Sequence, residues 1–330
     1  METRSITSLL ASLSRWVAAM LVSVIIPTHD RADLLLQTLT VLCRQSHRPL
    51  QIIVVDDGST DDTWERLGVW TAARASLCGL TFCRLRQARA GAPAARNHGL
   101  SVARGDFIQF LDSDDSLSSD KLGLQASALA KASGLGGVYC AWRSWFDGSL
   151  IRYGPRGQTS AIAEQDMLLG YLGGNWFLPI HAYLFRRGLL DQVGPWNTRL
   201  TYEEDAEYML RILAVGARFG FVPGCVVDYR RHGAAQVSRR RTPDEGQRHV
   251  QSIAFRERIC EQLPAAQRPA ARAAVAALAA RLSDGSAAPY PAASGRRVLA
   301  DFGRTSVGRV IRRRFGDALL AWLAYAIGLR

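Results

Sequence analysis

The sequence predicts an α/β protein with a mostly parallel sheet flanked by helices, followed by a helical and basic C-terminal extension. From residue 21 to about residue 131, short apolar runs rich in β-branched residues alternate with stretches of helical periodicity, which is the pattern of repeated strand–helix units. With 330 residues, of which 48% are hydrophobic and 21% charged, the chain can bury a large core and is not a disordered protein. Residues 231–330 hold 18 arginines, no lysine and 7 acidic residues, so they carry +11 of the net charge of +12.

Strands and helices are expected to alternate along the first part of the chain. The first strand covers residues 21–26, an apolar run that ends at Pro27, and its apolar character predicts burial on both faces. Further strands are expected at residues 51–55, 80–85 and 107–111. Helices are expected at residues 34–42, from about residue 60, where acidic side chains suit the helix dipole, and at residues 94–104.

The second part of the chain is less regular. Strands are expected at residues 137–146, 183–185 and 220–229, and a helix at residues 202–215. An arginine- and alanine-rich helix at residues 269–282 leads into a linker-like segment, after which the last 35 residues have helical spacing. The six cysteines form no CxxC pair, so neither a zinc site nor a disulfide framework is indicated.

These patterns predict three regions. Residues 1–19 form a dispensable extension, because Met20 stands directly before the first strand and nothing earlier resembles a site or a signal peptide. Residues 20–235 form the α/β domain. Residues 236–330 form the helical, arginine-rich C-terminal region.

Polar clusters follow three of the expected strands, at residues 28–31, 56–59 and 112–115. Because ligands of open parallel sheets bind outside the carboxyl ends of the strands, we expect these clusters to share one rim. Their carboxylates would repel one another without a cation, and a divalent metal with oxygen ligands is the natural partner. The sheet has neither a GxGxxG nor a GxxxxGK[ST] loop. Phosphates must then be held by metal and arginine, for which Arg96 near a helix start is a candidate.

Five motifs in order carry a family resemblance. They are Ile-Ile-Pro-Thr-His-Asp-Arg at 25–31, Val-Val-Asp-Asp-Gly-Ser at 54–59, Ala-Ala-Arg-Asn-His-Gly at 94–99, Phe-Leu-Asp-Ser-Asp-Asp at 110–115, and the Glu-Asp pair at 204–205. Together they resemble the family 2 glycosyltransferases of the GT-A fold, over about residues 21–232. One departure is His-Asp in the first motif, where Tyr-Asn is usual.

The resemblance implies a role for each matching residue. Asp205 corresponds to the general base of the inverting members. Asp114 of the DxD motif and His232, in the segment Tyr-Arg-Arg-His, correspond to metal ligands for Mn²⁺ or Mg²⁺. The residues that correspond to the donor-binding positions are Pro27, Thr28, Asp30, Arg31, Asp56, Asp57, Arg96, Asp112 and Ser113.

The chemistry agrees with this interpretation. A nucleoside diphosphate leaves as an anion, and a bound divalent metal stabilises the developing charge. The acceptor hydroxyl must lose a proton, which a positioned carboxylate can accept. We therefore expect metal-dependent, inverting transfer from a nucleotide sugar, most simply a UDP-sugar, to a saccharide or lipid-linked acceptor, as in cell-surface polysaccharide synthesis.

Two alternatives explain part of the sequence. A nucleotidyltransferase acting on sugar phosphates also uses paired aspartates and Mg²⁺, but it would carry a glycine-rich loop after the first strand, where residues 27–30 are Pro-Thr-His-Asp. A nucleic-acid-binding protein would use the basic tail, but this leaves the acidic rim unexplained, and no RNA-binding motif is present. We expect no nucleic-acid partner.

The basic tail suggests a location. A mainly apolar segment at residues 317–329 follows Arg312, Arg313 and Arg314; it is too short to span a bilayer but suits the surface of an anionic one. A helix packed back on the catalytic domain, with its arginines in solvent, explains the same pattern. We expect a cytoplasmic protein that can lie at the cytoplasmic face of the membrane.

Overall fold

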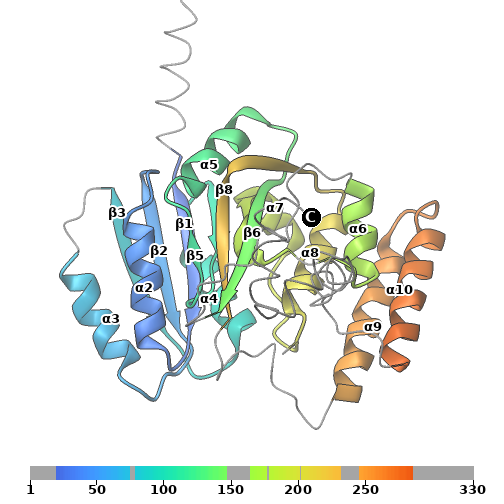
Figure 1. The fold of residues 1–330 in the computed structure, drawn as a ribbon, viewed down its shortest axis with the longest axis horizontal. Helices are drawn as coiled ribbons and strands as arrows, with labels where there is room; N and C mark the ends of the chain where they lie inside the picture. The colour runs from blue at the N-terminus through green and yellow to red at the C-terminus, as the bar shows by residue number, and fades with distance from the viewer. Residues whose placement is uncertain are drawn as a thin grey trace, which may run out of the picture.

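The computed structural model describes residues 20–74, 79–146, 164–176, 178–200, 202–231 and 245–284. These residues form one eight-stranded sheet with helices on both sides (Figure 1). The strand order is β3-β2-β1-β4-β7-β6-β8-β5. The predicted fold class, a mostly parallel sheet flanked by helices, is confirmed.

One half of the sheet is parallel and comes from the first third of the chain. Its strands are β1 (Val22–Thr28), β2 (Leu50–Asp56), β3 (Leu80–Arg86) and β4 (Phe107–Phe110). All residues of β1, β2 and β4 are buried, as expected for strands covered on both faces. In the register of β1 and β2, Thr28 lies beside Asp56, so the residues that follow the two strands emerge at the same edge.

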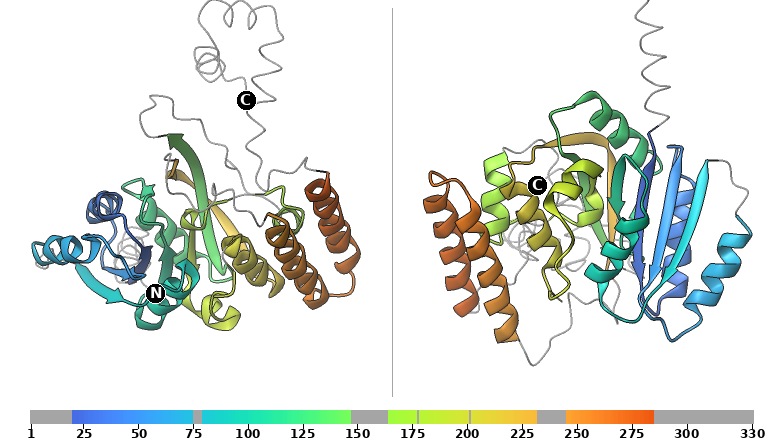
Figure 2. Two further views of the ribbon diagram at one scale, coloured as in Figure 1. Left: turned by 90° about the horizontal axis from the view of Figure 1, so that it is seen from below. Right: turned by 180° about the vertical axis from the view of Figure 1, so that it is seen from behind.

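Three helices cover this half. They are α2 (Ala32–Cys43), α3 (Thr63–Ala72) and α4 (Ala92–Val102). Helices α2 and α3 lie side by side on one face, and α4 packs against β1 and β2 on the other (Figures 1 and 2). Gly99 lets α4 approach closely, because a Cβ at this position would lie 2.4 Å from Cγ2 of Ile25.

The other half of the sheet is mixed. Its strands are β5 (Ser116–Leu117), β6 (Gly137–Phe146), β7 (Tyr183–Arg186) and β8 (Phe219–Arg231). Strand β7 joins the two halves by pairing antiparallel with both β4 and β6, whereas β6 and β8 are parallel to each other. Helix α5 (Lys121–Lys131) packs against β8, β6 and β7.

The remaining helices pack against the mixed half or against one another. They are α6 (Glu164–Leu172), the short 3₁₀ helix η1 (Ile180–Ala182), α7 (Arg187–Val193), α8 (Glu204–Ala214), α9 (Glu245–Gln262) and α10 (Arg268–Ser283). Helices α9 and α10 form an antiparallel pair at the opposite end of the molecule from β3 (Figure 1). Helix α9 packs on α8 and α10 packs on α6. Phe255, Ile259 and Val275 belong to the same hydrophobic core as the sheet, so the described part of the C-terminal region packs as one unit with the sheet.

The N-terminal extension, residues 1–19, and the basic segment from residue 285 onward lie outside the described residues. In the part of the chain that the structure describes, no helix has both the length and the apolar character needed to cross a membrane.

Candidate active site

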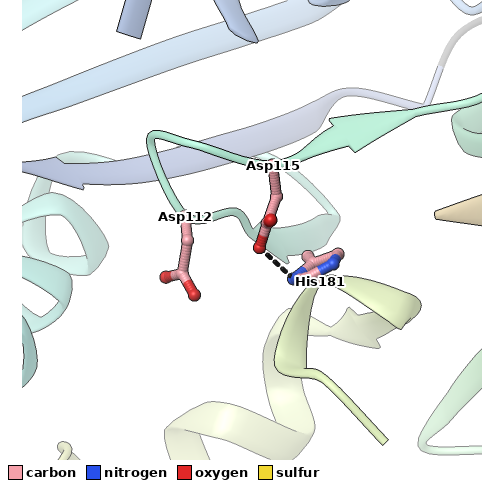
Figure 3. A group of neighbouring side chains, drawn as sticks. All are labelled: Asp112, Asp115 and His181. Carbon is pink, nitrogen blue, oxygen red and sulfur yellow. Dashed lines mark ion pairs between the residues drawn. The ribbon is translucent and has the colours of Figure 1, made fainter. Parts of the chain in front are cut away.

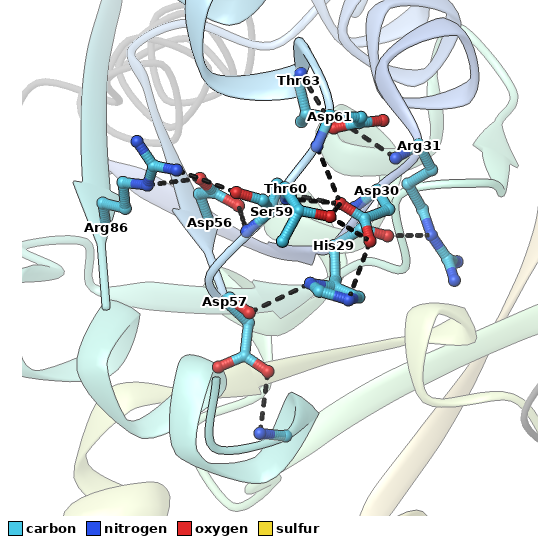
Figure 4. A network of polar contacts seen from close by, with 11 residues as sticks. His29, Asp30, Arg31, Asp56, Asp57, Ser59, Thr60, Asp61, Thr63 and Arg86 are labelled. Carbon is cyan, nitrogen blue, oxygen red and sulfur yellow. Dashed lines mark hydrogen bonds and ion pairs between the residues drawn. The ribbon is translucent and has the colours of Figure 1, made fainter. Parts of the chain in front are cut away.

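The loops after β1 and β2 are tied together by the first predicted cluster (Figure 4). Asp30 has a positive φ of 48°, and its carboxylate accepts hydrogen bonds from the backbone N–H groups of Thr60 and Asp61, at 2.7 and 3.2 Å. The Asp30 N–H in turn donates to Oγ of Ser59 at 3.0 Å. Asp30 therefore shapes this corner of the rim, and its pKa is lowered mainly by the hydrogen bond from Thr60.

Asp56 and Asp57 face different partners. Asp56 is fully buried, accepts the Ser59 N–H at 2.9 Å and pairs with Nε of Arg86 at 3.1 Å. Asp57 accepts the backbone N–H groups of Ala90 and Gly91, each at 2.8 Å, so it holds the loop that leads into α4. Both carboxylates of the second motif thus organise the rim through backbone and arginine contacts.

Arg96 contacts three carboxylates of the site. It lies on α4 and is 3% exposed. Its Nη2 donates to Oδ1 of Asp112 at 2.9 Å, and its Nη1 lies 3.5 Å from Oε1 of Glu204 and 3.4 Å from Oδ1 of Asp205. One guanidinium therefore joins the end of β4 to the start of α8, two segments about 90 residues apart in the chain.

An aromatic pair supports this arginine. The guanidinium carbon of Arg96 lies 4.5 Å from the centre of the Trp196 ring, and Trp196 stacks on Tyr208 of α8 with centroids 4.1 Å apart. Burial opposes the charge of Arg96, but the carboxylates of Asp205, Asp112 and Glu204 raise its pKa, so it stays protonated. The position of a permanent cation is thus fixed between the two acidic segments.

The environment of Asp205 suits a general base. Loss of hydration raises the pKa of its carboxyl to about 7, and the charges of Glu204 and Asp112 add to this effect against the opposing charge of Arg96. Its Oδ1 is buried and accepts no hydrogen bond from the described residues. A base works best when its pKa lies near the working pH, and this carboxylate meets that condition.

A second group of ligand atoms lies on the other side of Asp112. One oxygen each of Asp112 and Asp115 and a ring nitrogen of His181 all lie within 4.8 Å of one another (Figure 3). Nδ1 of His181 is 3.2 Å from Oδ2 of Asp115, and both residues are buried. His181 comes from η1, so the mixed half of the sheet contributes it.

The chemistry of this group fits a divalent cation. Burial and the charges of Asp114 and Asp112 raise the pKa of Asp115, and burial lowers the pKa of His181 to about 4. A neutral imidazole is the form that binds metal. Neither ring nitrogen of His181 nor Oδ2 of Asp115 has a well-formed hydrogen bond within the described residues, and buried polar atoms of this kind normally have a partner. Two carboxylates and a histidine form a suitable donor set for Mn²⁺.

The other predicted residues are distributed around this centre. Nη1 of Arg31 pairs with Oδ2 of Asp114 at 3.2 Å, so the predicted metal ligand Asp114 contacts an arginine in this structure, and Asp115 takes the place beside Asp112. The Ser113 carbonyl accepts the Thr38 hydroxyl at 3.1 Å. Pro27 and Thr28 are buried at the end of β1. The predicted ligand His232 lies outside the described residues.

Sequence reasoning did not identify Asp115, His181 or Trp196 as site residues. Asp115 belongs to the acidic cluster predicted at residues 112–115, but the DxD motif gives a role only to Asp112 and Asp114. No short sequence pattern around His181 or Trp196 indicates a site. His181 reaches the site through the antiparallel course of β7, and Trp196 reaches it through the loop before α8. The carboxylate of Glu203, which immediately precedes α8, is buried against Arg256 of α9 at 2.8 Å.

The chain matches the family described as glycosyl transferase family 2 over residues 23–194. It belongs to this family. Among curated relatives, it is 26% identical over 212 residues to the amylovoran biosynthesis glycosyltransferase AmsB of Erwinia amylovora, covering 63% of this chain and 68% of AmsB. It is 37% identical over 95 residues to a β-1,3-glucosyltransferase, WfaP, of Escherichia coli, covering 29% of this chain and 36% of WfaP. The chain thus aligns with only about a third of the length of WfaP.

Solved structures confirm the GT-A architecture of this family 2 glycosyltransferase. The first 349 residues of TarS from S. aureus, in complex with UDP-GlcNAc, superpose with a TM-score of 0.62 at 17% identity, covering 94% of this chain and 92% of that one. The mannosyltransferase PcManGT from Pyrobaculum calidifontis, in complex with GDP-Man and Mn²⁺, gives a TM-score of 0.53 at 19% identity, covering 96% and 93%. The family match makes the protein a transferase enzyme, and the solved structures show that it has the GT-A fold.

Proposed function

We propose that this enzyme transfers a sugar, with inversion of configuration, from a UDP-sugar to a saccharide or lipid-linked acceptor in the synthesis of a cell-surface polysaccharide, and that the reaction needs a divalent metal. The observation that carries the proposal is the position of Arg96 between Asp112 and Asp205, at 2.9 and 3.4 Å. Asp112 lies at the end of β4, on the rim where the donor would bind, and Asp205 is a carboxylate with a raised pKa. Because both contact the guanidinium of Arg96, they lie next to each other.

The donor binds along the rim at the carboxyl ends of β1, β2 and β4. The corner shaped by Asp30 and Asp57 receives the nucleoside, and Asp112 receives the ribose and diphosphate end. Arg96 neutralises negative charge that develops on the leaving diphosphate, as fixed cations do in preorganised sites. Its burial keeps that charge from being screened by water.

The metal would be held by Asp112, Asp115 and His181. When bound, it would supply positive charge that stabilises the leaving diphosphate. Asp114 and His232 remain predicted ligands from the family resemblance, and Asp114 could exchange its contact with Arg31 for one with the donor.

Asp205 acts as the base. Its carboxylate must come within about 2.6–3.2 Å of the acceptor hydroxyl, where it accepts the proton as the hydroxyl oxygen attacks the anomeric carbon. The bond to the diphosphate breaks on the opposite face, so one displacement inverts the configuration. Glu204, beside Asp205, holds Arg96 from the same helix start and favours the neutral form of Asp205 by its charge.

The names of similar proteins support the donor and acceptor classes. The TarS structure contains UDP-GlcNAc, AmsB is named for amylovoran biosynthesis, and WfaP is named as transferring glucose from UDP-Glc to a GlcNAc-diphosphoundecaprenol. A lipid-linked acceptor also suits a basic tail at an anionic membrane. We extend the proposal to a cytoplasmic enzyme that binds the cytoplasmic membrane surface through residues 285–330.

A nucleotide-sugar panel tests the function. The full-length protein is mixed with UDP-glucose, UDP-galactose, UDP-N-acetylglucosamine or GDP-mannose, with Mn²⁺ or with EDTA, and its melting temperature and the release of nucleotide are measured. We expect stabilisation by at least one UDP-sugar and slow UDP release that EDTA abolishes. Stabilisation by a nucleoside triphosphate and by no nucleotide sugar, with release of pyrophosphate when a sugar phosphate is added, would instead support a nucleotidyltransferase.

Vesicle binding tests the location. We expect the full-length protein to sediment with vesicles that contain anionic phospholipid and not with neutral ones, and we expect loss of binding after truncation at residue 285. Failure to sediment with anionic vesicles at low salt would contradict the proposed membrane binding. It would not bear on the proposed transfer reaction.

A further inference from the structure

The start of α8, which carries Glu204 and Asp205, is held by a buried ion pair from the C-terminal region. Nη1 of Arg256, on α9, donates to Oε2 of Glu203 at 2.8 Å, and its Nη2 donates to Oε1 of Glu203 at 3.4 Å. Glu203 immediately precedes α8. Arg256 is 1% exposed and Glu203 is 7% exposed, so this is a desolvated pair and not a surface contact.

Every nitrogen of this guanidinium has a partner. Besides Glu203, Arg256 donates from Nε to the Tyr171 carbonyl at the end of α6, at 3.2 Å, and from Nη1 to the carbonyl of Ser252 at 3.0 Å. The Ser252 hydroxyl also donates to the Glu203 carboxylate. Arg256 therefore joins α6, α8 and α9 at one point, and removal of either charge would leave the other buried without its opposite charge.

The pair also holds a strained backbone. Glu203 has φ 54° and ψ 25°, in the left-handed region that residues other than glycine avoid. Such a conformation persists only where the surroundings determine it strongly. The Glu203 carbonyl accepts the N–H of Glu207 at 3.0 Å, which begins the first turn of α8. The left-handed residue thus sets the direction in which the chain enters the helix.

That direction decides where the base lies. Asp205 is two residues after Glu203, and its Oδ1 is 3.4 Å from Arg96 on α4. The first turn of α8 is consequently held from two sides, by Arg96 on the side of the donor and by Arg256 on the side of the C-terminal helices. We infer that Arg256 is a positioning residue for transfer: it acts through Glu203 to hold Asp205 at the acceptor, so the C-terminal helices are part of the catalytic apparatus. This inference rests on the proposed role of Asp205.

The matched control is Arg281 on α10. It also reaches from the C-terminal helices into the body, donating to Oδ1 of Asn175 at 2.6 Å and to the Gly173 carbonyl. Within the described residues, its hydrogen bonds go to the loop after α6 and none goes to α8. Arg281→Met therefore removes an arginine of the same helical pair without disturbing Glu203.

The experiment measures three quantities on the full-length protein: the rate of UDP release from a mixture of UDP-glucose, UDP-galactose and UDP-N-acetylglucosamine with Mn²⁺, the affinity for UDP with Mn²⁺, and the melting temperature. In Arg256→Met we expect the rate to fall by between about tenfold and about 100-fold, as misplaced catalytic groups do, with UDP affinity within about twofold of wild type. In Arg281→Met we expect a lower melting temperature and a rate within about twofold of wild type.

A second set of variants separates positioning from stability. When Arg256→Met is added to Asp205→Asn, the rate of UDP release should fall by less than about twofold further, because the effect of Arg256 passes through Asp205. If Arg256→Met does not fold, the double variant Glu203→Gly/Arg256→Met removes both charges and gives the left-handed position a glycine. We expect that variant to fold and to lose at least about tenfold in rate.

Different outcomes overturn different claims. A wild-type rate in folded Arg256→Met or in the double variant, or an equal loss with and without Asp205, would overturn the positioning role alone. A wild-type rate in Asp205→Asn, or no UDP release from the wild-type protein, would overturn the proposed function and this inference with it.

Discussion

The two halves of the sheet contribute to the site in different ways. The parallel half places Asp30, Asp57 and Asp112 on loops that directly follow β1, β2 and β4, and their partners are mostly backbone N–H groups. The mixed half and its helices contribute His181 and Asp205, whose partners are charged side chains. The loops proposed to bind the donor are thus built by local chain geometry, whereas the proposed base, Asp205, and the candidate metal ligand His181 depend on packing between distant segments.

This difference predicts which property of the enzyme a substitution in each half will affect. A carboxylate that accepts backbone N–H groups, such as Asp57, is fixed by the loop that contains those groups. A carboxylate that is held by Arg96 depends on the relative position of α4 and α8. Substitutions in the parallel half should therefore affect donor binding, and substitutions around Arg96 should affect the reaction of a bound donor.

The largest effect is expected at the junction of the two halves. Asp112 contacts Arg96 and belongs to the candidate metal group, so Asp112→Asn should lower UDP release by about 10³-fold and remove its dependence on Mn²⁺. The control is Asp33→Asn, which removes a carboxylate that is paired with Arg66 on the surface and is 79% exposed; its rate should stay within about twofold. Full Mn²⁺-dependent activity in Asp112→Asn would show that the two halves do not meet at this residue.

The next effect is a pH dependence that belongs to the mixed half. The pKa of Asp205 is raised to about 7, and a base must be ionised to accept a proton. The rate with saturating donor should therefore be about tenfold lower at pH 6 than at pH 8. Glu204→Gln removes a charge that raises this pKa, so the midpoint should move to lower pH. A flat profile over this range, or an unchanged midpoint in Glu204→Gln, would contradict the assignment.

A smaller effect is expected from the support of Arg96. Trp196→Phe keeps a ring but loses part of the surface under the guanidinium and the stack on Tyr208. Since a cation–π contact contributes about 0.5–2 kcal/mol, we expect about a threefold to tenfold loss in rate. Steady-state kinetics at several temperatures would separate this from a loss of folded protein. No change at all would mean that the Asp112 and Asp205 carboxylates alone fix Arg96.

The smallest effect is expected from residues 1–19, which precede both halves. A chain that begins at Met20 should fold and release UDP within about twofold of the full-length rate, because β1 begins at Val22. A well-folded protein without activity would contradict the prediction that this extension is dispensable.

The sequence predicted the parallel half closely because its signals are local. The apolar, β-branched runs of β1 and β2 and the acids that follow them can be recognised in windows of a few residues, and the predicted strands agree with the observed ones to within one or two residues at each end. The helix expected from about residue 60 begins at Thr63, since the backbone N–H groups of Thr60 and Asp61 bind the Asp30 carboxylate.

The mixed half was harder because its contacts are not local. No short pattern indicates that β7 runs antiparallel between β4 and β6, yet this course brings His181 beside Asp115. A buried pair such as Glu203 and Arg256 looks like two surface charges in the sequence, since only the packing of α9 on α8 buries them. The family resemblance indicated Asp205 as the base, but its contact with Arg96 required the structure.

The most direct test of the account is Asp205→Asn, which keeps the size of the side chain and removes the proton acceptor. The account predicts that UDP with Mn²⁺ binds within about threefold of wild type, since the rim and Arg96 remain, and that sugar transfer or donor hydrolysis falls by about 10²-fold or more. A variant that melts at a lower temperature but reacts at nearly the wild-type rate would contradict it. Asp205 would then only stabilise the start of α8, and Glu204 would be the next residue to test as the base.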